Sequence, residues 1–88
     1  MHPYHIIESI CKDHDFHVRL MAGANTDYTT FCISNLSKSP NHLLYGSCRQ
    51  HFITLGLGAH PTRRDYDLHD PESISEIKDH ILSAMGIC

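Results

Sequence analysis

The sequence predicts an α+β domain in which an antiparallel sheet of three to four strands carries the two terminal helices on one face. Apolar residues recur at helical spacing near both ends of the chain, and they alternate with polar residues at strand spacing in between. Turn-forming residues separate these segments. At 88 residues the chain has the length of one domain, so residues 1–88 are expected to form a single folding unit.

Each predicted helix has a start signal and an apolar stripe. Pro3 suits the first turn of a helix over residues 3–13. The stripe of that helix comprises Ile6, Ile7, Ile10 and Cys11. Near the carboxyl end, Ser73 and Glu76 have the spacing of a capping box. The stripe that accompanies them comprises Ile74, Ile77, Ile81, Leu82 and Met85.

The middle of the chain predicts strands. Residues 16–21 alternate in polarity, residues 28–34 are rich in β-branched and aromatic side chains, and the turn at 23–27 joins them as a hairpin. Residues 52–59 predict a further strand, and residues 60–70 predict a polar connector. The sheet face away from the helices is expected to carry His17, Arg19, Met21, Thr30, Cys32 and Thr54. This face is either exposed or used for association, and a homodimer would add burial to so small a chain.

Residues 40–50 leave two interpretations open. Residues 43–45 fit a third strand, whereas Ser39 as a cap with Pro40 at the first helical position fits a short helix. The strand is favoured, because Gly46 would weaken the interior of a helix by about 1 kcal/mol.

Acidic residues concentrate in the last part of the chain. The net charge is −3, but residues 65–88 hold six acids and only Lys78 as a base, which gives −5. The six acids are Asp65, Asp67, Asp70, Glu72, Glu76 and Asp79. They are the predicted partner-binding residues. Complementary charge speeds encounter and selects against wrong partners, so the expected partner is a protein with a basic surface.

A row of carboxylates can also stand in for a phosphate backbone. The sequence therefore favours a small non-enzymatic inhibitor that needs no cofactor and blocks a nucleic-acid-handling complex, in the manner of phage anti-defence or anti-CRISPR proteins. The link to such inhibitors is one of association with the acidic character alone. The alternative is an ordinary solvated helix face, whose first acids are favoured by the helix dipole.

Charge and hydropathy disfavour several other partners and locations. Direct binding to nucleic acid is disfavoured because the one adjacent basic pair, Arg63 and Arg64, is followed at once by acids. No apolar run approaches the roughly 18–20 residues of a membrane span. The first residues do not resemble a secretory signal, so free thiols and a cytoplasmic location are expected.

Two further hypotheses rest on the nine histidines and four cysteines. One is a metal- or pH-responsive regulatory module. Its weak candidate ligands are Cys11, His14, Cys48 and His51, which are of zinc-binding type but lack zinc-finger spacing. The other is a small enzyme using Cys48 or His60, since Arg49 and His51 lie close to Cys48 in sequence and could lower the pKa of its thiol.

Overall fold

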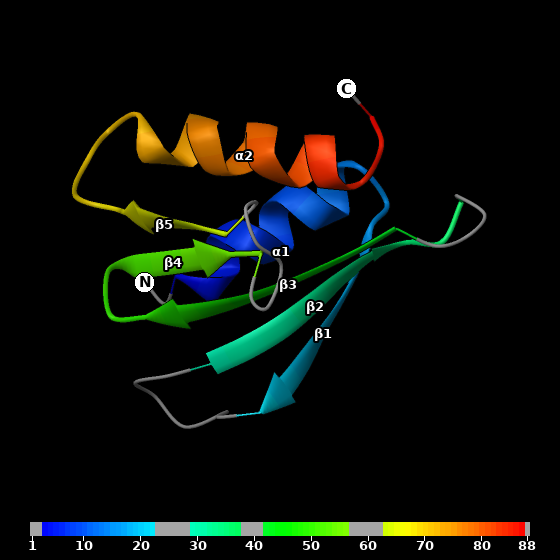
Figure 1. Cartoon of the computed structure of the whole chain (residues 1–88), viewed down its shortest axis with the longest axis horizontal. Helices are drawn as coiled ribbons and strands as arrows, with labels where there is room; N and C mark the ends of the chain where they lie inside the picture. Colours follow the sequence, from blue (N-terminus) through cyan, green and yellow to red (C-terminus); the bar gives the residue numbers. More distant parts are fainter. Residues whose placement is uncertain (1–2, 23–28, 38–41, 57–62, 88) are drawn as a thin grey trace.

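The computed structural model describes residues 3–22, 29–37, 42–56 and 63–87. The elements follow the order α1 (Tyr4–Asp13), β1 (His17–Ala22), β2 (Thr29–Asn35), β3 (His42–Arg49), β4 (Phe52–Leu55), β5 (Arg64–Asp67) and α2 (Ser73–Ala84). The five strands lie in chain order in one antiparallel sheet (Figure 1). The fold is therefore of the predicted α+β class. Within the described ranges, neither helix has the length and apolar character needed to cross a bilayer.

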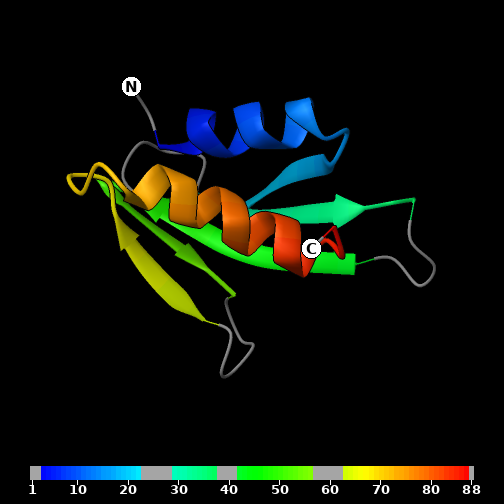
Figure 2. The same cartoon turned by 90° about the horizontal axis from the view of Figure 1, so that it is seen from above.

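One hydrophobic core lies between the two helices and one face of the sheet. Helix α1 contributes Ile7 and Ile10 to it, and α2 contributes Ile77 and Ile81. The strands contribute alternate residues, namely Phe31, Ile33, Leu44, Cys48, Ile53, Leu55 and Tyr66. Figure 2 shows α1 and α2 side by side and running in similar directions. Burial of these apolar side chains, at roughly 25 cal/mol per Å², is the main force that holds the helices on the sheet.

The sheet has five strands, one more than the upper limit of the prediction. The extra strand is β5, which lies inside the predicted polar connector over residues 60–70. Only Tyr66 of this strand is buried, and its other three residues are exposed. Such a charged edge strand is held by hydrogen bonds to β4 and has too few apolar residues to give an alternating pattern.

Residues 42–49 form strand β3, which confirms the favoured interpretation and makes the helical one wrong. The next strand, β4, ends at Leu55, earlier than predicted. Gly56 follows with a φ of 84°, a left-handed conformation that glycine adopts without strain. Residues 57–59 of the predicted strand lie outside the described ranges.

The structure corrects three predicted details: the cap of α2 and the burial of Ile74 and Leu20. The capping box is not formed, since α2 has no side-chain cap and the Ser73 hydroxyl donates to the Asp70 carbonyl oxygen at 2.8 Å. Ile74 is 49% exposed. Leu20 is 46% exposed, in strand β1, where the register shifts between Leu20 and Ala22. The shift makes Met21 the extra residue of a bulge, which interrupts the predicted alternation.

Five of the six side chains predicted for the face opposite the helices belong to it by strand register, namely His17, Arg19, Thr30, Cys32 and Thr54, whereas Met21 is the bulge residue. Cross-strand pairs place Arg19 opposite Cys32 and Cys32 opposite Tyr45. Thr54 lies opposite Ser47 on the same face. Exposed apolar side chains also lie here, on the strands β3 and β4, namely Leu43, Tyr45 and Phe52. No helix of the described chain covers this face.

Candidate functional site

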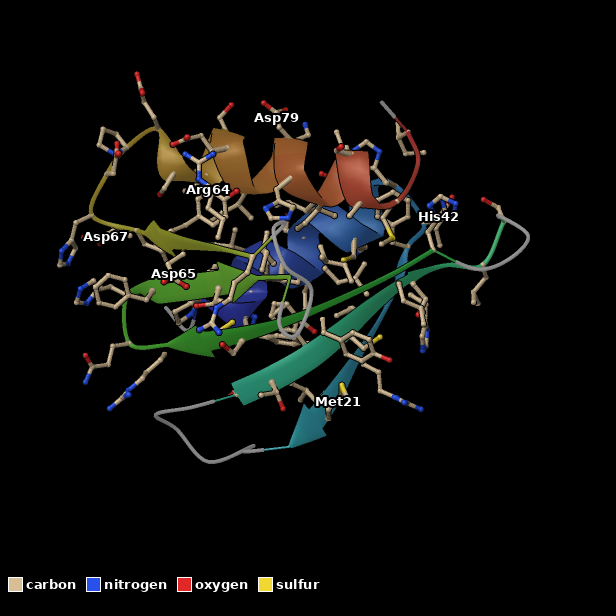
Figure 3. All side chains as sticks on the ribbon, in the orientation of Figure 1. Met21, His42, Arg64, Asp65, Asp67 and Asp79 are labelled. Atoms are coloured by element: carbon tan, nitrogen blue, oxygen red, sulfur yellow. The ribbon has the colours of Figure 1, made fainter. Side chains whose placement is uncertain are left out.

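The six predicted partner-binding carboxylates lie along one continuous stretch of structure, from β5 through the following turn to α2. We call these residues, Asp65, Asp67, Asp70, Glu72, Glu76 and Asp79, the acidic surface. All are exposed except Glu76, which is half-buried. Asp65 and Asp67 flank the buried Tyr66 and so belong to the face away from the helices, whereas Asp79 lies on α2 (Figure 3). The acidic surface thus extends around the β5 edge of the sheet.

Two carboxylates of the acidic surface are engaged within the molecule. A carboxylate oxygen of Glu76 lies 3.2 Å from a guanidinium nitrogen of Arg64, and this ion pair joins α2 to β5. The side chains are 63% exposed for Arg64 and 42% exposed for Glu76, so solvent screens the ion pair and it adds little stability. The Thr54 hydroxyl donates a hydrogen bond of 2.7 Å to Asp65. The main role of this ion pair and this hydrogen bond is to fix the positions of the Glu76 and Asp65 carboxylates.

Two other carboxylates shape the turn between β5 and α2. Asp67 accepts a hydrogen bond from the His69 backbone N–H at 2.9 Å, and Asp70 accepts one from the Glu72 backbone N–H at 3.0 Å. Aspartate commonly holds turns in this way, by bonding to the backbone two residues on. Within the described part of the chain, the carboxylates of Glu72 and Asp79 have no hydrogen-bond or ion-pair partner, so both are available to another molecule.

A cavity of about 800 Å³ lies between α2 and the strands, and sequence reasoning did not foresee it. Inside it the Tyr66 hydroxyl oxygen lies 2.8 Å from His80 Nδ1, and the Arg64 guanidinium carbon lies 5.4 Å from the centre of the Tyr66 ring. Burial raises the pKa of Tyr66. Burial, and then the charge of Arg64, lower the pKa of His80. Both groups are therefore uncharged at neutral pH, and the tyrosine can donate to the imidazole.

The lowered pKa of His80 predicts a pH-dependent stability. Its pKa in the folded protein lies below the reference value of 6.5, so below that pH the unfolded chain takes up this proton more readily than the folded one. The free energy of unfolding should therefore fall as the pH drops from about 6.5 toward the folded-state pKa. We expect His80→Gln to reduce this fall, measured by urea unfolding at several pH values. An identical pH profile in the variant would contradict the assignment, because the two proteins differ only at residue 80.

The structure does not bring together the four candidate metal ligands predicted from the sequence, Cys11, His14, Cys48 and His51. Cys11 and Cys48 are about 1% exposed, and burial raises the pKa of each thiol to about 12. The ring of His14 stacks on Phe16 with 5.6 Å between ring centres. His51 instead belongs to the one group of three close potential ligands found among the described residues, and none of the other candidates is in that group.

The candidate nucleophile Cys48 is poorly suited to chemistry. A thiol must ionise and be accessible to attack a substrate, and burial opposes both at this position. Arg49 and His51 are near it in sequence, but Cys48 points into the core. His60, the other candidate catalytic residue, lies outside the described ranges.

Comparison of the chain with protein-family models, curated proteins and solved structures finds no match. The features that bear on function are therefore those of the molecule itself: the acidic surface, the cavity that contains Tyr66 and His80, and the ligand group that includes His51. Of these, the acidic surface extends over the longest continuous stretch of the described chain.

Proposed function

We propose that this chain is a small non-enzymatic binding protein whose acidic surface docks on a basic surface of another protein. A basic surface that holds DNA or RNA would suit such a row of carboxylates, so the docked chain would act as an inhibitor of a nucleic-acid-handling complex. A phage anti-defence or anti-CRISPR protein that acts by docking would work in this way. The single observation that carries the proposal is the run of six exposed or half-buried carboxylates along β5, the turn and α2.

The charge balance of this stretch supports a basic partner. Between Arg64 and Asp79 the only arginine or lysine residues are Arg64 itself and Lys78, and Arg64 is already paired with Glu76. Most of the negative charge is therefore not neutralised within the molecule. A surface of one sign speeds encounter with the opposite sign, and it makes the association sensitive to salt.

The acidic surface is also held in a fixed shape. Helix α2 is anchored by the buried Ile77 and Ile81, and β5 by the buried Tyr66. The buried Asn35 adds a tie, since its side-chain amide donates to the Met85 carbonyl oxygen at 2.8 Å, at the end of α2. A surface held in this way loses little conformational freedom on docking, which favours affinity.

Charge reversal on α2 tests the proposal. We expect Glu72→Lys combined with Asp79→Lys to abolish salt-sensitive capture of basic proteins from a cell lysate, because both exposed carboxylates are unpaired. The wild-type chain should retain the same proteins at low salt and release them at roughly 0.5 M salt, where charge interactions are screened within a few ångströms. Quantitative mass spectrometry of the captured proteins measures the effect.

The matched control changes the same net charge elsewhere. Glu8→Lys combined with Asp13→Lys reverses two exposed carboxylates of α1 and should leave capture intact. If both double variants lose capture equally, net charge rather than the acidic surface is responsible. If neither loses it, docking does not use these carboxylates and the proposal is wrong.

A further inference from the structure

Three potential metal ligands meet at the end of the sheet beside the β3–β4 turn. His51 lies in that turn, Asp67 is the last residue of β5, and His69 follows two residues later. The pairing of β4 with β5 sets Phe52 opposite Asp67, so the turn and the end of β5 are neighbours. The backbone N–H of Leu68 donates to the His51 carbonyl oxygen at 2.8 Å and holds the two segments together.

The distances between the ligand atoms of the three side chains are close to those found around a bound metal ion. One Asp67 carboxylate oxygen lies 3.9 Å from His51 Nε2 and 3.7 Å from His69 Nδ1, and one ligand atom from each residue falls within 4.8 Å of the others. Tetrahedral zinc, with bonds of about 2.0–2.2 Å, would hold its ligand atoms about 3.4 Å apart. Contraction by about half an ångström is thus sufficient for the two contacts to Asp67.

The adjustment falls mainly on His69, because the His51 ring also packs against the Phe52 ring with 4.2 Å between their centres. The rings of His51 and His69 are stacked, with 4.1 Å between centres and 13° between planes, so a ring must turn before both nitrogens point to one ion. The side chains are 37% exposed for His51 and 74% exposed for His69, and neither ring nitrogen is hydrogen-bonded within the described chain. The His69 backbone N–H meanwhile steadies the carboxylate of Asp67.

We propose that His51, Asp67 and His69 bind a divalent transition-metal ion of the zinc class. Two imidazoles and one carboxylate suit zinc, copper or nickel, whereas magnesium and calcium prefer sites built of oxygen alone. Three protein ligands leave a coordination position open to water or to a group from another molecule. The site does not include the buried thiols of Cys11 and Cys48. Asp67 also belongs to the acidic surface, but ion binding by these three side chains requires no docking partner.

Calorimetric titration of chelator-treated protein with Zn²⁺ tests the proposal. We expect one ion to bind per chain, and we expect His51→Ala, His69→Ala and Asp67→Asn each to weaken binding by about tenfold or more, since even outer-shell partners contribute 10–100-fold. The control is His5→Ala with Glu8→Gln. That pair is an exposed histidine and carboxylate with only 3.0 Å between ring nitrogen and oxygen, but it forms no group of three ligands with the other described residues. It should leave the affinity unchanged.

Imidazole NMR signals provide a second readout that does not rely on affinity alone. On addition of Zn²⁺ the ring nitrogens of His51 and His69 should shift first, and those of His5 and His17 should follow only with excess metal. Backbone amide spectra of each variant verify that it is folded. Zinc affinities equal to wild type in all three ligand variants would overturn the proposal, as would a first NMR response at other histidines.

Discussion

Gly46→Ala should lower the free energy of unfolding by about 3 kcal/mol, the upper end of the usual cost of overpacking. Gly46 lies in the middle of β3, opposite Phe31 on one side and Leu55 on the other. A Cβ atom there would come within 2.6 Å of Phe31 Cζ and 2.7 Å of the Thr54 carbonyl oxygen. The ring could move, but the carbonyl belongs to the backbone of β4, so the sheet itself must shift.

Urea unfolding of wild type and variant measures this effect through the midpoint and the slope. Gly86→Ala is the comparison, because Gly86 has a φ of 80° after α2 and alanine there should cost about 1 kcal/mol of backbone strain. The two variants therefore separate crowding from backbone conformation. A Gly46 variant no less stable than the Gly86 variant would mean that the sheet accommodates the methyl group without strain.

Gly46 also shows which features local sequence patterns can predict and which they cannot. Gly46 correctly favoured a strand over a helix at residues 40–50, because glycine destabilises a helix interior whatever its tertiary surroundings. The packing of the Phe31 ring against Gly46 could not be predicted, since it depends on the register between β2 and β3. Helix positions and the alternating strands β1 and β2 were recoverable for the same reason: their signals repeat within one short segment.

Strand β5 was missed for a physical reason. Its sequence, from Arg64 to Asp67, contains one inward side chain, Tyr66, and three exposed ones. Four residues with a single apolar member do not establish a period of two, and charged residues are what an edge strand needs to avoid pairing with other chains. The strand exists because β4 offers a free row of backbone groups and Tyr66 can fill the core.

The missed strand explains most of what sequence reasoning missed in the candidate sites. Tyr66 reaches His80 only because β5 packs beside α2, and His51 meets Asp67 only because β4 pairs with β5. Neither pair has a spacing that a local motif would reveal. The acidic surface, by contrast, could be proposed from the sequence because its members follow one another along the chain.

Helix α2 should depend strongly on Ile77. Its side chain is fully buried in the core, and Ile77→Ala should lower the free energy of unfolding by about 3 kcal/mol, through lost apolar burial and the cavity left behind. That loss is large against the roughly 5–15 kcal/mol that stabilises a typical domain. Because Glu76 and Asp79 share this helix, the variant should also weaken docking even though no carboxylate is changed.

Ile74→Ala is the control, because it makes the same isoleucine-to-alanine substitution on the same helix. Ile74 has the helical phase of the apolar stripe, yet it is the second residue of α2 and is 49% exposed. Its truncation should change stability by less than about 0.5 kcal/mol, as at other exposed positions. Equal losses for the two variants in urea unfolding would show that the first turn of α2 is as deeply packed as its centre. The anchoring of the acidic surface would then rest on the whole stripe rather than on Ile77 and Ile81.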